Sequence, residues 1–220
     1  MRAIRIGITG KLGSGKSLMV KAMEARGFFC VRSDDLAREM MEHDPSLRVK
    51  LTEILGANAY SNGSLDRKFV ASKIFSDRTL RKKVEAVVHP AVTREIERIF
   101  EAHSNEMVAV ESALILQSRF QERFDYIILI ESPDSEAIAR VSSDGRLSQA
   151  DAEARLAEQA GDSIAREEAD FIIENSDTKA SFEKKCEKLL NVLDALRTRE
   201  LPEEPLHLES SSSDDSSSVK

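Results

Sequence analysis

Gly10-Lys11-Leu12-Gly13-Ser14-Gly15-Lys16-Ser17 fits the pattern G-x-x-x-x-G-K-[ST]. A short apolar segment rich in β-branched residues, Ile4 to Thr9, precedes it, and a helix-like stretch, Leu18 to Arg26, follows it and ends at Gly27. This order is typical of a loop that wraps phosphate groups, because glycines let backbone N–H groups turn inward and the helix adds its positive N-terminal end. An ordinary glycine-containing turn is the alternative, which the three fixed positions and both flanks disfavour.

Two side chains at the end of this loop suit nucleotide chemistry. We expect Lys16 to reach the β- and γ-phosphates of ATP and the hydroxyl of Ser17 to hold Mg²⁺. The whole stretch from Gly10 to Ser17 is therefore the predicted nucleotide-binding loop.

The composition favours a folded enzyme that acts on small molecules. Of the 220 residues, 41% are hydrophobic and 32% charged, which suffices for one core with a solvated surface. The net charge of -7 and the pI near 5.3 argue against a general affinity for nucleic acid or anionic membrane. The sequence lacks the run of about eighteen apolar residues that a membrane-spanning helix needs. We therefore expect no nucleic-acid or membrane partner, and a monomer or weak homo-oligomer.

The cysteines and the start of the chain favour a reducing compartment. Cys30 and Cys186 lie far apart and form no metal-binding spacing, and Met1 to Ile4 does not begin an apolar signal segment. We therefore expect a cytoplasmic location.

Apolar segments alternate with helical patterns, which indicates an α/β fold with a parallel sheet covered by helices. The predicted strands are Ile4 to Thr9, Phe28 to Arg32, Met107 to Ser112, Tyr126 to Glu131 and Phe171 to Glu174. Residues 35–103 are mostly helical in pattern, with breaks at Asp44-Pro45, Gly56 and Ser61-Asn62-Gly63, and we expect them to form a substrate lobe.

The C-terminal part combines a predicted lid with a predicted tail. A helix expected over Ser148 to Ala160 follows the flexible connection Ser142 to Gly145, so residues 140–160 are predicted to be a mobile lid. From Leu201 the pattern gives way to prolines and a serine and aspartate tract, so residues 201–220 are predicted to be disordered and residues 1–200 to form the domain.

Further short motifs follow the loop in order. They are Ser33-Asp34-Asp35-Leu36-Ala37-Arg38, Gly63-Ser64-Leu65-Asp66-Arg67, Ile74-Phe75-Ser76-Asp77, Val88-His89-Pro90, Phe124-Asp125, Ala152 to Gln159 ending in R-x-x-x-Q, and Ala169-Asp170 with Asn175. In this order the chain resembles the dephospho-coenzyme A kinase family over residues 4 to about 195. The resemblance implies a P-loop kinase fold with a helical substrate-binding lobe and a lid. It also implies ATP-dependent phosphorylation of the 3′-hydroxyl of dephospho-coenzyme A, the last step of coenzyme A synthesis.

The resemblance and the predicted strands suggest two acidic site residues. Asp34 matches the second aspartate of the family's D-A-D segment and is the predicted catalytic base, with a helix N-cap as the alternative. Glu111 ends the third predicted strand, where P-loop enzymes place an acid near the magnesium ion, and the alternative is a solvated carboxylate at the sheet edge.

The remaining candidates are basic residues and one amide. Arg67 and His89 match motif positions and are predicted to bind the acceptor substrate; a solvated helix face and a turn or cap are their alternatives. Arg140 lies at the start of the lid and is predicted to clamp the transferred phosphate, although surface arginines are common. Asn175 matches a position expected near adenine, with a plain turn as its alternative.

Five positions depart from the family pattern. Lys11 replaces a glycine, Arg32 the first aspartate of D-A-D, Ala113 and Gln117 fall in an altered V-P-L-L-F-E segment, and Ser143 replaces a lid arginine whose charge Arg146 could supply. Because loss of a phosphate-stabilising arginine slows transfer, two alternatives stay open. They are a kinase of another nucleoside or nucleotide and a catalytically weakened nucleotide-binding regulator.

Overall fold

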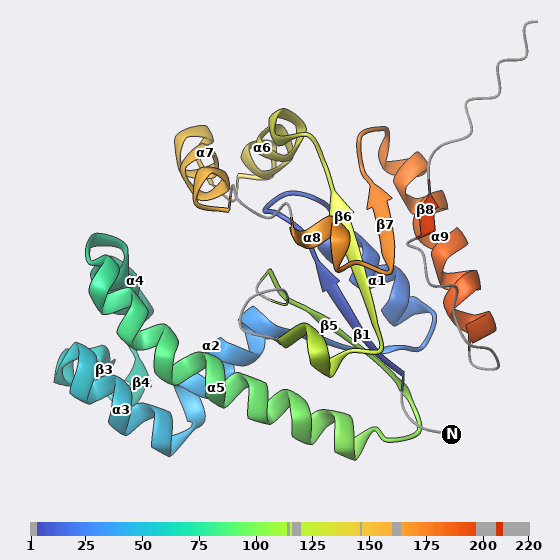
Figure 1. Ribbon diagram of the computed structural model, residues 1–220. Coiled ribbons are helices and arrows are strands. Elements are labelled where there is room, and N and C mark those ends of the chain that lie inside the picture. The colour runs from blue at the N-terminus through green and yellow to red at the C-terminus, as the bar shows by residue number, and fades with distance from the viewer. Residues whose placement is uncertain are drawn as a thin grey trace, which may run out of the picture. The chain divides into compact units, whose positions relative to one another are not determined.

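Figure 1 shows the computed structural model, which describes residues 4–113, 115, 120–145, 147–159, 164–196 and 206–208. The chain divides into two units. The smaller unit is Val31–Glu106, and the larger unit is Ile4–Cys30 together with the described residues from Met107 onward.

The larger unit is built on a parallel sheet, as the sequence predicts (Figure 1). Strand β1 (Ile4–Thr9) pairs in parallel with β5 (Met107–Glu111) and β6 (Tyr126–Glu131), and β6 pairs in parallel with β7 (Phe171–Glu174). The strand order is β2-β5-β1-β6-β7-β8, in which β2 (Phe29–Arg32) is the element where the chain passes into the smaller unit. The α/β prediction is confirmed.

Alternate residues of β6 and β7 bury opposite faces of this sheet. Ile128 and Ile130 pack in one core with helices α1 (Lys16–Ala25) and α9 (Lys179–Ala195). Ile127 and Leu129 pack in a second core on the other face. Because side chains of a strand point alternately to its two faces, continuous apolar runs are what a sheet covered on both sides requires.

Two helices follow β6, and the predicted lid, residues 140–160, covers the end of the first and the whole of the second. Helix α6 (Asp134–Ser143) and helix α7 (Gln149–Glu158) pack on each other and bury Ala137, Val141, Ala152 and Leu156. The Ser148 hydroxyl accepts a hydrogen bond from the Asp151 N–H and caps α7. Short elements η2 (Phe120–Arg123) and α8 (Ile164–Glu167) complete this part.

The smaller unit is mostly helical, as its sequence pattern indicates. Its elements are α2 (Ser33–His43), α3 (Pro45–Leu55), η1 (Ala57–Ala59), β3 (Tyr60–Ser61), β4 (Ser64–Leu65), α4 (Arg67–Ser76) and α5 (Arg78–Ala102). Each predicted break separates two elements. Asp44 caps α3, and Asn62 with Gly63 forms the β3–β4 turn at φ values of 51° and 88°.

One prediction needs correction within the tail. Residues Leu206–Leu208 form strand β8, which pairs in parallel with β7, so these three residues are not disordered as predicted. Without β8, the backbone N–H and C=O groups at this edge of β7 would have no strand to pair with. The short segment Leu206–Leu208, before the serine tract, provides that strand. The other residues of 201–220 lie outside the described parts of the chain. Across those described parts, no helix combines the length and the apolar character needed to cross a bilayer.

Candidate active site

The glycine loop joins β1 to α1 and has no room for larger side chains. Gly13 has φ of 72°, and a Cβ atom there would stand 2.5 Å from the Ala137 carbonyl oxygen. Gly15 has φ of 114°, and its Cβ would stand 2.6 Å from Nδ2 of Asn175. Such backbone conformations favour glycine, and the two close approaches leave no space for a Cβ atom at Gly13 or Gly15.

The side chain of Lys16 folds back onto the loop that precedes it. Its Nζ donates hydrogen bonds to the carbonyl oxygens of Gly10 at 2.8 Å and Lys11 at 2.9 Å. Ser17 follows in the first turn of α1, where backbone N–H groups lack helical acceptors. The buried Ser14 hydroxyl has no hydrogen-bond partner among the described residues. A cationic amine, a helix N-terminus and an unsatisfied hydroxyl together fit a phosphate group.

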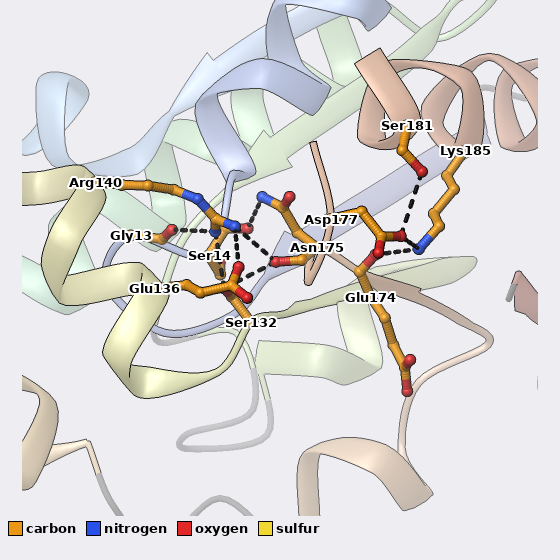
Figure 2. Close-up of polar contacts among 10 residues, drawn as sticks. All are labelled: Gly13, Ser14, Ser132, Glu136, Arg140, Glu174, Asn175, Asp177, Ser181 and Lys185. Atoms are coloured by element: carbon orange, nitrogen blue, oxygen red, sulfur yellow. Dashed lines mark hydrogen bonds and ion pairs between the residues drawn. The ribbon is translucent and has the colours of Figure 1, made fainter. Parts of the chain in front are cut away.

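Asn175 is hydrogen-bonded to the loop (Figure 2). Its Nδ2 donates to the Ser14 carbonyl oxygen at 2.7 Å, and its backbone N–H donates to the Glu131 carbonyl oxygen at 2.7 Å. The side chain is only 4% exposed. The residue that the sequence associates with adenine thus braces the phosphate loop, and an adenine contact stays a prediction.

Arg140 links the lid to the same region (Figure 2). Its guanidinium donates to the Ser132 hydroxyl at 2.8 Å, to the Asn175 carbonyl oxygen at 2.9 Å and to the Glu136 carboxylate at 2.6 Å. A longer contact of 3.4 Å reaches the Gly13 carbonyl oxygen. The predicted phosphate clamp is therefore partly buried beside the loop and already paired with a carboxylate, which holds its charge in place.

The segment after β7 is held by a buried lysine. Nζ of Lys185 donates to the Glu174 carbonyl oxygen at 2.8 Å and to the Asp177 carboxylate at 3.1 Å (Figure 2). The Lys185 side chain is only 7% exposed, whereas that of Asp177 is 40% exposed, so the lysine is buried and its carboxylate partner faces water in part. Asn175 lies between these two contacts in the sequence, which restricts its backbone.

Carboxylates at the ends of β6 and β7 are neutralised by one arginine of α8. Arg166 donates to both oxygens of Glu131, at 2.9 Å from Nε and 2.5 Å from NH2, and to Glu174 at 3.2 Å. The paired carboxylates, Glu131 above all, raise the pKa of Arg166 above its ordinary value. A cavity of about 360 Å³ lies beside these carboxylates and is also lined by Gly10 and Lys11.

Of the candidate magnesium residues, Ser17 lies in the first turn of α1 and Glu111 at the C-terminal end of β5. Glu111 ends β5 in register with Ile8 of β1, two residues before Gly10, and is half-buried rather than fully solvated. In the described residues, no three His, Cys, Asp or Glu side chains form a cluster that could hold a metal ion. A cation here would have to rely on Ser17, Glu111 and the oxygens of a bound phosphate.

The other candidates lie on the smaller unit, and all three are exposed. Asp34 lies in the first turn of α2, whose N-cap position is Arg32, so Asp34 is not the N-cap. Arg67 is the first residue of α4, and its NH2 atom lies 3.8 Å from Oε2 of Glu42. His89 lies inside α5 before Pro90, which excludes the turn and cap interpretation.

Two of the positions that depart from the family pattern, Lys11 and Ser143, make polar contacts with α6. Lys11 pairs with Asp134 at 3.2 Å, an exposed contact worth about 1 kcal/mol or less. The Ser143 hydroxyl donates to the Arg140 carbonyl oxygen at 3.0 Å near the end of α6. Gln117 and Arg146 lie outside the described residues.

Comparison with known proteins identifies the family. The family model for dephospho-CoA kinase matches residues 4–181, which span the glycine loop, both lid helices and β7. The chain belongs to the dephospho-CoA kinase family. The resemblance inferred from the motifs is thereby confirmed, and the alternatives of another kinase or a regulator gain no support.

Individual relatives agree with this membership. Dephospho-CoA kinase of Porphyromonas gingivalis is 30% identical over 174 residues, covering 79% of this chain and 86% of the relative. Dephospho-CoA kinase of Anaeromyxobacter dehalogenans is 30% identical over 204 residues, covering 91% and 97%. The solved dephospho-CoA kinase of Campylobacter jejuni shares the fold, with a TM-score of 0.66 and 24% identity over 88% of this chain and 98% of that one. The family is a group of phosphotransferases that carry out the final step of coenzyme A biosynthesis.

One contact of the lid was not singled out from the sequence. Gln159, the last residue of the R-x-x-x-Q motif, accepts a hydrogen bond from the Leu12 N–H through Oε1 at 2.9 Å. The motif marked the residue, but its partner lies 147 positions away, so no local pattern could reveal the contact.

Proposed function

We propose that this chain transfers the terminal phosphoryl group of Mg-ATP to the 3′-hydroxyl of dephospho-coenzyme A. The observation that carries the proposal is the glycine loop onto which the Lys16 side chain folds, which lies within the 4–181 family match together with Asp34 and Arg140. Transfer of a phosphoryl group needs positioning and neutralisation of charge more than covalent help from the protein.

Each residue of the loop has a defined task in this proposal. Lys16 exchanges the carbonyl oxygens of Gly10 and Lys11 for phosphate oxygens, so its charge moves only a short distance when nucleotide binds. Ser17 and Glu111 would hold Mg²⁺, which would supply positive charge against the phosphate oxygens. Arg140, kept in orientation by Glu136, supplies positive charge beside Gly13.

The acceptor residues belong to the smaller unit. Asp34 presents an exposed carboxylate in the first turn of α2 and accepts the proton of the attacking hydroxyl in this mechanism. Arg67 and His89 are also exposed and bind the anionic or polar groups of dephospho-coenzyme A. We also propose a cytoplasmic location, which rests on the cysteine pattern noted above.

The experiment is direct detection of coenzyme A formed from dephospho-coenzyme A and Mg-ATP. We expect Asp34→Asn to lower kcat by roughly 10² to 10⁴ fold, the range for loss of a general base. Asp35→Asn is the matched control, because Asp35 is adjacent and exposed and forms an ion pair with Arg38 of the same helix. We expect that control to keep nearly full activity.

Three results would contradict the proposal. If no coenzyme A forms although Mg-ATP binds tightly, dephospho-coenzyme A is not the phosphoryl acceptor. Full activity of Asp34→Asn would reject the base. Equal losses in Asp34→Asn and Asp35→Asn would point to a damaged helix α2 rather than to lost proton transfer.

A further inference from the structure

Lid helix α7 contacts the phosphate loop through its C-terminal residue. Gln159 is the C-cap of α7, and its Oε1 accepts the Leu12 N–H at 2.9 Å in a partly buried contact. The contacts from Arg140 to Gly13 and from Asn175 to Ser14 end on carbonyl oxygens of the loop. Gln159 instead occupies an N–H group, the kind of donor that the loop uses for phosphate.

The geometry of α7 relates this contact to Arg155, the arginine of the R-x-x-x-Q motif. Ala152 and Leu156 form the buried face of α7, and Gln159 lies three residues after Leu156 on that side. Arg155 lies one turn before Gln159 and is exposed. Because a helix is stiff over one turn, a contact that holds Gln159 on the loop also fixes the position of the Arg155 backbone relative to Leu12.

We propose that Gln159 is a positioning residue that latches lid helix α7 to the phosphate loop through the Leu12 N–H. The latch leaves the later loop residues Gly13 to Ser17 to hold phosphate and keeps the turn of α7 that carries Arg155 at a fixed distance from the loop during transfer. Its catalytic consequence rests on the kinase activity proposed above, whereas the contact itself does not. A lost latch should therefore affect the chemical step more than nucleotide capture.

The first measurement is amide hydrogen exchange of the loop in the nucleotide-free protein. In Gln159→Leu, which removes the acceptor while keeping similar volume, we expect Leu12 to exchange roughly tenfold faster. Gln149→Leu is the matched control, because Gln149 is the first residue of the same helix and its side chain bonds to Glu153 on the surface. That control should leave the exchange of Leu12 unchanged.

The second measurement is steady-state kinetics with the thermal melts of the same variants. We expect Gln159→Leu to lower kcat roughly 5- to 10-fold with the KM for ATP changed less than about twofold. Gln159→Glu retains an acceptor oxygen and should recover protection of Leu12. The control Gln149→Leu should keep wild-type kcat.

Separate outcomes overturn separate parts. Unchanged exchange at Leu12 in Gln159→Leu would overturn the latch even if the kinase reaction is confirmed. If Gln159→Leu speeds exchange at Leu12 but keeps wild-type kcat, Gln159 is only a structural cap and the positioning role is overturned. The same holds if this variant lowers the melting temperature without lowering kcat. Equal losses of kcat in Gln159→Leu and Gln149→Leu would reduce the effect to helix stability and also overturn it. Failure of the wild-type protein to form coenzyme A would reject the proposed function without altering the exchange result.

Discussion

Replacing Asn175 with aspartate should destabilise the protein strongly although the two side chains have the same shape. The amide Nδ2 donates to the Ser14 carbonyl oxygen at 2.7 Å, and the residue is only 4% exposed. Asn175→Asp removes this donor and places a carboxylate oxygen against a carbonyl oxygen. An unsatisfied buried carbonyl costs about 1–3 kcal/mol, and a buried carboxylate adds to that cost.

We therefore expect a loss of about 3 kcal/mol in the free energy of unfolding near neutral pH, which lowers the melting temperature by roughly 6–12 °C for a chain of this size. The pH dependence has a defined sign. Burial raises the pKa of the introduced carboxyl above its unfolded value, so its penalty is present at neutral pH and is lost as acid protonates it. The protonated carboxyl can then donate to the Ser14 carbonyl oxygen as the amide did.

The assay is thermal unfolding followed by circular dichroism at neutral and mildly acidic pH, with Asn191→Asp as the control. Asn191 is on α9, and its Oδ1 accepts from two nitrogens of Arg26 at 3.0 Å each, a role that aspartate retains. The control should match the wild-type melting temperature. A loss in Asn175→Asp no larger than in the control, or an equal loss at both pH values, would refute the reasoning.

Three further predictions concern other parts of the chain. Gly13→Ala should weaken binding of a fluorescent ATP analogue, because its Cβ would stand 2.5 Å from a carbonyl oxygen of α6; wild-type affinity would show that the loop tolerates a side chain. Asp44→Ala should cost about 1 kcal/mol in urea unfolding as a lost N-cap. The Ser46 hydroxyl and nearby N–H groups hold the pKa of Asp44 below its ordinary value, so this cost should disappear as the pH falls through that lowered pKa, and a cost independent of pH would contradict the assignment. Cys186 should resist thiol reagents in the native Cys30→Ser variant, because burial raises the pKa of Cys186 to about 12; prompt labelling without denaturant would count against this burial.

The sheet and the loop were predictable because their signals are local. Glycine spacing, the apolar runs of β1 and β6 and the lysine at the helix start all act within a few residues of each other. The predicted bounds of β1, β6 and β7 agree with the structure, while α1 begins at Lys16 rather than Leu18. Strand β8 was missed, because a three-residue strand depends on the edge of β7 and not on its own pattern.

The supports of the loop were not predictable in the same way. Asn175 and Arg140 were candidates from the sequence, but the contacts that hold them run to Ser14 and Gly13, more than one hundred positions away. No periodicity or spacing encodes such pairs, because they form only when β6 and β7 bring their C-terminal ends beside β1. The same reason hid the contact between Gln159 and Leu12.

The sequence by itself determined the α/β class, the position of the glycine loop and the family, because backbone preferences of glycine and the alternation of apolar segments are properties of short stretches. Only the tertiary structure decided that the amide of Asn175 braces Ser14, that Arg140 is paired with Glu136, and that Gln159 joins the lid to the loop. These contacts depend on distance and direction between separate elements, since a hydrogen bond forms only when donor and acceptor meet at about 3 Å with suitable alignment.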